Sequence, residues 1–117
     1  MKLTHYLSAI LVGIGLASIP LSSSADFFSG NKLLPRLEAS LDPKGGVYDS
    51  GVGIGYVQGA TDALAQMNLV CVPTSATAGQ VERIVHKYLV NRPERLHEGA
   101  SFLVYVALRE AFPCKGK

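Results

Sequence analysis

The sequence carries few charges, and the two signs almost cancel. Of its 117 residues 17% are charged, with 11 Lys and Arg against 9 Asp and Glu, while 48% are hydrophobic. A chain this apolar is not intrinsically disordered, and a net charge of +2 gives no electrostatic preference for nucleic acid. The length excludes a multidomain enzyme. We therefore expect one small folded domain that does not bind nucleic acid.

The sequence also lacks the motifs that carry chemistry. Glycines 51, 53 and 55 resemble a dinucleotide-binding fingerprint only in number, because Gln58 stands where the motif needs its third glycine. The residue types that bind zinc lack the short spacings of zinc ligands; they are Cys71, His86, His97 and Cys114. Acidic residues are scattered among basic neighbours, unlike a glycosidase pair; they are Asp62, Glu94, Glu98 and Glu110. We expect no cofactor and no metal.

The apolar run near the N-terminus has the features of an export signal. It extends from Tyr6 to Leu21, and Ser23 and Ala25 supply the small side chains that a signal peptidase requires. The run has about 16 residues, whereas a transmembrane helix needs roughly 20. We predict a signal peptide over residues 1–25, cleaved after Ala25, and a mature domain over residues 26–117. The mature protein is expected in the periplasm without membrane attachment.

Cysteine is almost absent, but its two occurrences are informative. Cys71 and Cys114 both lie in the exported part, and an even number of cysteines in an oxidising compartment usually forms disulfides. We predict a bridge between them. The enzyme alternative is a hydrolase in which Cys71 pairs with His86 or His97, and the bridge would remove its nucleophile. We expect the protein not to be an enzyme.

Apolar residues recur at helical spacing in four segments. The expected helices cover residues 31–41, 49–68, 78–91 and 93–112, and the fold class is an all-α bundle of about four helices tied by one disulfide. Pro35 fits the first helix only if it lies in the first turn. Thr77 and Gln80 predict a capping box before the third helix.

Two of these helices carry features that bear on packing. Gly55, Gly59 and Ala63 recur every four residues in the second helix, a spacing that would let a neighbouring helix approach closely. The apolar stripe of that helix continues to Met67. In the fourth helix Phe102 and Tyr105 lie away from the main apolar stripe. That helix is therefore expected either at the centre of the bundle or against a partner.

Basic residues are concentrated in the second half of the chain. They are Arg83, Lys87, Arg92 and Arg95. Glu82, Glu94 and Glu98 interleave with them, a pattern more typical of a solvated surface than of a docking patch. His86 is expected on the solvated side of the third helix, one turn from Glu82.

Several short motifs together resemble a known family. They are Gly55-Tyr56-Val57-Gln58-Gly59-Ala60-Thr61-Asp62-Ala63, Cys71-Val72-Pro73, Gly79-Gln80-Val81, Tyr88-Leu89, Pro93-Glu94, Ala107-Leu108 and Phe112-Pro113-Cys114. In this order and spacing, over residues 31–114, they resemble the Rap/Tai family of type VI secretion immunity proteins. The resemblance implies a small helical periplasmic protein that inhibits a peptidoglycan amidase injected by neighbouring bacteria. It also implies a disulfide between Cys71 and Cys114, and a homodimer in several members.

The resemblance also suggests where the partner binds. An inhibitor of this kind usually blocks a papain-like amidase cleft with a loop, so residues 42–50 and 72–76 are candidate inhibitory segments, with Tyr48 as an aromatic anchor. The predicted partner contacts are Tyr48, Arg83, Lys87, Arg92, Arg95 and Tyr105. Many members carry a second cysteine pair, near Leu37 and just ahead of Gly55, which this sequence lacks. The alternative function is a periplasmic adaptor or acid-stress chaperone of the same helical fold.

Overall fold

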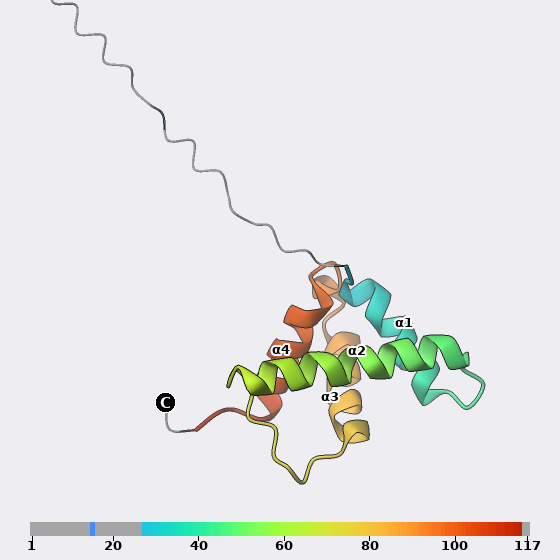
Figure 1. Cartoon of the computed structure of the whole chain (residues 1–117). Coiled ribbons are helices and arrows are strands. Elements are labelled where there is room, and N and C mark those ends of the chain that lie inside the picture. The colour runs from blue at the N-terminus through green and yellow to red at the C-terminus, as the bar shows by residue number, and fades with distance from the viewer. Residues whose placement is uncertain (1–14, 16–26, 116–117) are drawn as a thin grey trace, which may run out of the picture.

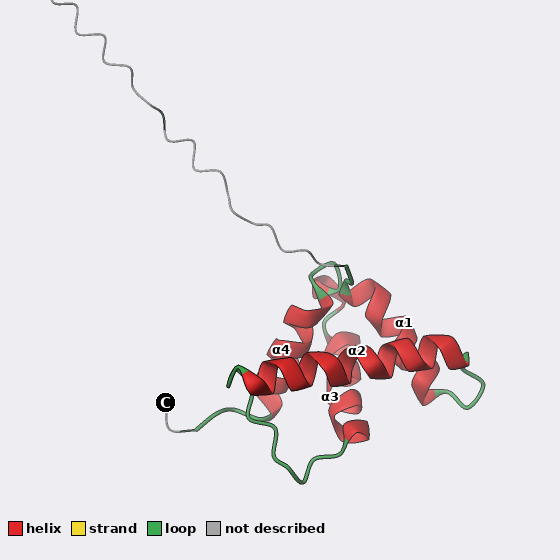
Figure 2. Ribbon diagram, in the orientation of Figure 1, coloured by secondary structure: helices red, strands yellow, loops and turns green. Residues whose placement is uncertain are grey.

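A computed structural model describes Gly15 and residues 27–115. The described chain forms helices and loops without an extended strand (Figure 2), which confirms the all-α class. The elements in order are α1 (Gly30–Leu41), α2 (Val47–Gln66), α3 (Ala78–Asn91), the short 3₁₀ helix η1 (Pro93–Arg95) and α4 (Ala100–Ala111). The expected signal peptide, residues 1–25, and its cleavage site lie outside the described residues, apart from Gly15.

Helix α2 packs against each of the other three helices. It crosses in front of them in Figure 1, and its most extensive contact is with α1. The core between the helices is apolar, and no polar or charged side chain of the described residues is buried in it. Its members are Leu33, Leu37, Val57, Val70, Val81, Val85, Tyr88, Leu89, Ala100, Leu103, Val104, Ala107 and Leu108. Each buried Leu or Val contributes roughly 1.5–3 kcal/mol relative to an exposed position. None of the helices described is long and apolar enough to cross a bilayer.

Helix α3 has the bounds that the sequence predicts. The Thr77 side chain accepts a hydrogen bond from the Gln80 backbone N–H at 3.2 Å, and the Gln80 side chain accepts one from the Thr77 N–H at 2.8 Å. This reciprocal capping box satisfies two backbone donors that a helix start leaves unpaired. The apolar stripe of α3 turns Val81, Val85 and Leu89 into the core.

Close approach between α1 and α2 occurs at a glycine other than the predicted ones. A Cβ placed on Gly53 would lie 2.8 Å from the Arg36 carbonyl carbon and oxygen in α1. Gly55 and Gly59 are exposed, with open space around the position of a Cβ, so the predicted packing at this pair is wrong. Gly55 and Gly59 therefore lie on a different face of α2 from Gly53, which meets α1.

Two further expectations about helix interiors need correction. Pro35 lies in the second turn of α1 rather than the first, and the helix continues through it. Pro35 and Asn31 are both exposed, so water can bind the Asn31 carbonyl that proline leaves without a partner. The C-terminal end of the predicted stripe in α2 is also exposed, with Met67 at 59%.

The fourth helix begins seven residues later than predicted. Residues 93–95 form η1, and the backbone at residues 96–99 pairs with the start of α1 instead of continuing as a helix. Asn31 N–H donates to the Leu96 carbonyl at 2.8 Å, and Gly30 N–H donates to the Glu98 carbonyl at 3.0 Å. These bonds hold residues 96–99 against the start of α1 in a turn that is not helical. The pairing fixes the start of α1 beside the start of α4.

The predicted disulfide is present. It joins Cys71, just after α2, to Cys114 beyond the end of α4, with 5.1 Å between the Cα atoms. The bridge therefore anchors the segment that leads into α3 to the C-terminal end of α4. Because both sulfur atoms are in the bridge, neither is available as the nucleophile that the cysteine hydrolase alternative requires.

Candidate functional site

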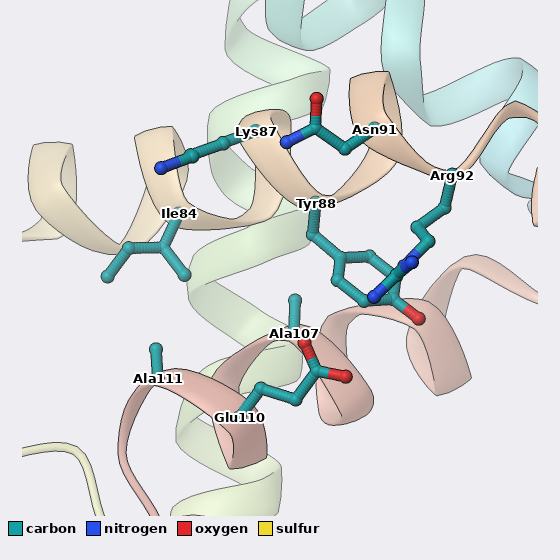
Figure 3. Close-up of a pocket in the computed structure, with 8 residues that line it drawn as sticks. All are labelled: Ile84, Lys87, Tyr88, Asn91, Arg92, Ala107, Glu110 and Ala111. Carbon is teal, nitrogen blue, oxygen red and sulfur yellow. The ribbon is translucent and has the colours of Figure 1, made fainter.

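A groove follows the exposed side of α3, where α4 and the segment before α3 flank it. We call it the α3 groove. Its first part, about 500 Å³, lies between α3 and α4 and includes Lys87, Tyr88 and Arg92 (Figure 3). Its second part, about 440 Å³, lies between the turn at residues 73–76, Arg83 and Phe112. Ile84 lines both parts, so they adjoin.

The groove forms because α4 presents small side chains to this side of α3. Ala107 and Ala111 end at Cβ and leave space between the helices, as Figure 3 shows. Ile84 and Tyr88 of α3 supply larger apolar surface beside them, and Phe112 supplies it in the second part. The result is an apolar floor with polar side chains at its edges.

The structure separates the charges that alternate in the sequence. Glu82 accepts a hydrogen bond from the Ser40 hydroxyl on α1, away from the α3 groove. Glu98 pairs with Arg95 at 2.7 Å. Glu94 is exposed on η1 and does not line the groove. The acidic residues that interleave with the basic cluster in the sequence therefore do not line the groove, which holds one acid, Glu110.

Three of the four basic candidates share the α3 groove. Arg83 lines the second part, and Lys87 and Arg92 line the first. All three are exposed, and none belongs to an ion pair within the described part of the chain. The Arg92 guanidinium lies 5.8 Å from the centre of the Tyr88 ring, within the range of a cation–π contact.

Arg95 is engaged inside the fold instead. Its Nη1 donates to the Tyr88 hydroxyl at 2.5 Å, and its Nε donates to Glu98 Oε2 at 2.7 Å. Its guanidinium also lies 5.6 Å from the centre of the Phe102 ring. The hydrogen bond to Glu98 raises the pKa of Arg95 above its ordinary value, which keeps the side chain a cation. Its position indicates that it holds η1 against α3.

Tyr48 lies far along the chain from this groove, at the start of α2. Only residues 42–46 of the expected inhibitory segment are a loop, because α2 begins at Val47. Tyr48 is 78% exposed and its neighbour Val47 is 91% exposed. Val47 was not among the predicted partner contacts. Its place at the start of a glycine-rich helix, where few neighbouring side chains can cover it, was the signal that could have indicated its exposure.

Tyr105 belongs to a different, largely apolar groove between α2 and α4, of about 710 Å³. Its hydroxyl accepts a hydrogen bond from Arg109. Met67, Leu69 and Phe102 line this groove and are substantially exposed, and Phe102 lies 6.2 Å from Tyr105 between ring centres. The second apolar side expected for the fourth helix is therefore exposed here. Met67 and Leu69 were not among the predicted contacts.

His86 is half-buried between α1 and α3 rather than free on the surface. Its Nε2 lies 3.9 Å from Glu38 Oε1 of α1, so its neighbour is Glu38 and not Glu82. Within the described residues, no group of three His, Cys, Asp or Glu side chains is arranged to hold a metal ion.

Residues 29–114 match the model of a protein family described as Rap1a immunity proteins. The chain belongs to the Rap1a immunity protein family. The match runs from the residue that pairs with Gly99 to the second cysteine of the disulfide, and so covers all four helices. No curated protein and no solved structure matches the chain.

Membership of the Rap1a family confirms the resemblance drawn from the sequence motifs. It makes the protein an immunity protein whose partner is a secreted effector. Apart from Arg95, which is bonded to Tyr88 and Glu98, the predicted contact residues are distributed over three surfaces. These are the α3 groove with Arg83, Lys87 and Arg92, the start of α2 with Tyr48, and the α2–α4 groove with Tyr105.

Proposed function

We propose that the protein is a periplasmic, non-enzymatic inhibitor of a peptidoglycan amidase delivered by a type VI secretion system. The match of residues 29–114 to the Rap1a immunity proteins carries this proposal, since it supplies the role of immunity and the class of partner. The order of the sequence motifs supports the amidase as the effector. The apolar run before Ala25 supports export, and the disulfide suits an oxidising compartment.

An inhibitor of this kind acts by occupying surface that the effector needs. Large exposed aromatic and aliphatic side chains supply most of the binding energy in protein interfaces, provided that the partner buries them. Val47 and Tyr48 form such a projection on the first turn of α2. We propose that this projection inserts into the amidase cleft, with the α2 helix as its rigid support.

We propose that two copies of the protein form a homodimer through the α2–α4 groove. The exposed Met67, Leu69 and Phe102 make this surface apolar. Its one charged lining residue, Glu98, is already neutralised by Arg95. Two copies of such a surface can meet without repulsion between like charges.

Co-expression tests the proposal. Amidases from a panel of type VI effectors are directed one at a time to the periplasm of a sensitive host, alone or together with the protein. We expect lysis with the amidase alone, survival with both, and a complex that purifies intact. Tyr48→Ala is expected to weaken rescue, while Leu41→Ala, another exposed residue near that end of α2, leaves it unchanged.

Two results would overturn the proposal. One is lysis that continues although the protein is present in the periplasm at the level of the amidase. The other is the absence of a complex with any amidase of a panel, together with suppression of aggregation of unfolded client proteins. The second result would favour the adaptor or chaperone alternative, in which the α2–α4 groove holds apolar segments of clients.

A further inference from the structure

The fold leaves the basic residues of the α3 groove without an acidic partner in the described chain. Arg83, Lys87 and Arg92 are exposed and form no ion pair within the residues described. Of the acids nearest to them in sequence, Glu82 bonds to Ser40, and Glu94 is exposed on η1 without lining the groove, where Glu110 is the one acid against three cations. A cluster of like charges repels itself unless something of opposite sign binds to it. The groove is thus electrostatically incomplete on its own.

The three charges do not form a line along α3. Arg83 and Lys87 are four residues apart, so at about 100° per residue they project from nearly the same side of the helix. Arg92 is the C-cap residue that follows α3, and it lines the first part of the groove from the end of the helix. A segment bound in the groove would therefore meet positive charge in both of its parts.

The apolar floor of the groove favours acidic partners that also carry apolar side chains. Ile84 is shared by both parts of the groove, and Tyr88 and Phe112 add aromatic surface. An apolar floor gains from contact with apolar side chains, so the best occupant carries apolar residues as well as carboxylates. Glu110 stands on the α4 side of the groove (Figure 3) and would repel a uniformly anionic surface such as a membrane.

We infer that the α3 groove binds an acidic segment of the effector, whose Asp or Glu residues pair with Arg83, Lys87 and Arg92 while its apolar residues contact the floor. The inference rests on the proposed function for the identity of the partner. It adds the chemistry of recognition at a surface separate from the Val47–Tyr48 projection. Electrostatic steering by Arg83, Lys87 and Arg92 would accelerate capture of the effector and make the association sensitive to salt.

The test compares two matched charge reversals. Lys87→Glu reverses a charge in the groove, and Lys32→Glu reverses an exposed helical lysine on α1 that lies outside it. Binding to a catalytically inactive form of the amidase that the protein neutralises in co-expression is measured at low and at physiological salt. We expect Lys87→Glu to raise Kd by about tenfold or more and to flatten the salt dependence. Lys32→Glu is expected to change Kd by less than about twofold.

A second probe separates this inference from the proposed function. A synthetic peptide of alternating Glu and Leu is titrated into the isotope-labelled protein, and amide shifts are followed by NMR. We expect shifts along Arg83, Lys87 and Arg92 that disappear in the Lys87→Glu variant. If the amidase binds and Lys87→Glu and Lys32→Glu weaken it equally, the inference is overturned while the proposed function stands.

The remaining outcomes are also decisive. If no amidase binds but the peptide still maps to the α3 groove, the proposed function fails and the acid-binding groove stands. If the peptide shifts residues elsewhere, or the shifts survive in Lys87→Glu, the groove is not an acidic-segment site. Co-sedimentation with phosphatidylglycerol vesicles that depends on Lys87 would assign the groove to anionic lipid and overturn the inference.

Discussion

Gly53 of α2 lies directly against the backbone of Arg36 in α1, where a Cβ would come within 2.8 Å of the Arg36 carbonyl oxygen. The atoms in the way are backbone, which cannot rotate aside as a side chain can. Gly53→Ala is therefore expected to push the two helices apart and to destabilise the protein by about 1–3 kcal/mol. Urea unfolding followed by circular dichroism measures the loss.

Gly55 is the matched control for this substitution. It lies two residues further along α2, with open space around the position of a Cβ. Gly55→Ala is expected to stabilise the protein by up to about 1 kcal/mol, since alanine is the better helix former. Equal effects of the two alanines would contradict the described contact between α1 and α2.

The end of α2 depends on one residue with a positive φ. Asn68 has a φ of 57°, its N–H donates to the Ala65 carbonyl at 3.0 Å, and the Leu69 N–H donates to the Leu64 carbonyl at 3.0 Å. This pair of bonds is the Schellman motif that ends a helix. Asn68→Ala is expected to cost about 1 kcal/mol, while Asn68→Gly is neutral or stabilising. Thermal unfolding of both variants checks the order, and an alanine variant as stable as the glycine variant would contradict it.

The disulfide is expected to supply a large share of the stability. It closes a loop with a sequence separation of 43 residues, and the chain-entropy relation gives about 4 kcal/mol for a loop of this size. The double variant Cys71→Ser/Cys114→Ser should lose about this amount in denaturant unfolding. Addition of dithiothreitol should produce the same loss in the native protein and none in the double variant. A native protein indifferent to reduction would refute the assignment.

The Tyr88 hydroxyl links η1 to α3 through its bond with Arg95. Tyr88 is buried, and it accepts the Arg95 Nη1–H at 2.5 Å. Tyr88→Phe is expected to keep the packing of the ring and to lose about 1–2 kcal/mol with the hydrogen bond. In the Arg95→Ala background the same change should cost much less, because the partner is already gone. Additive losses in this double-mutant cycle would exclude the coupling.

Local signals in the sequence determined the bounds of α3 but not those of α4. The capping box at Thr77 and Gln80 and the stop before Pro93 are short-range features, and the structure obeys them. Pro93 and Glu94 give an equally plausible helix start on local grounds. The competing hydrogen bonds from Gly30 and Asn31 arise more than sixty residues away along the chain, which no local pattern reveals.

The candidate site was predictable in its residue types but not in its charge. Alternation of Arg83, Lys87 and Arg92 with Glu82 and Glu94 indicated an ordinary solvated surface. The fold turns Glu82 towards Ser40 on α1, and Glu94 does not line the groove. Which side of a helix faces a neighbour decides which charges remain together, and this depends on tertiary packing. The same reason explains why Gly53, and not Gly55, meets α1.

The most direct test of immunity is a titration of the purified amidase with the purified mature protein. Hydrolysis of peptidoglycan is followed as the protein is added to a fixed amount of enzyme. We expect the amidase activity to fall linearly and to reach near zero when one binding site has been added per amidase, with no degradation of either protein. Full activity in the presence of excess protein would contradict the account.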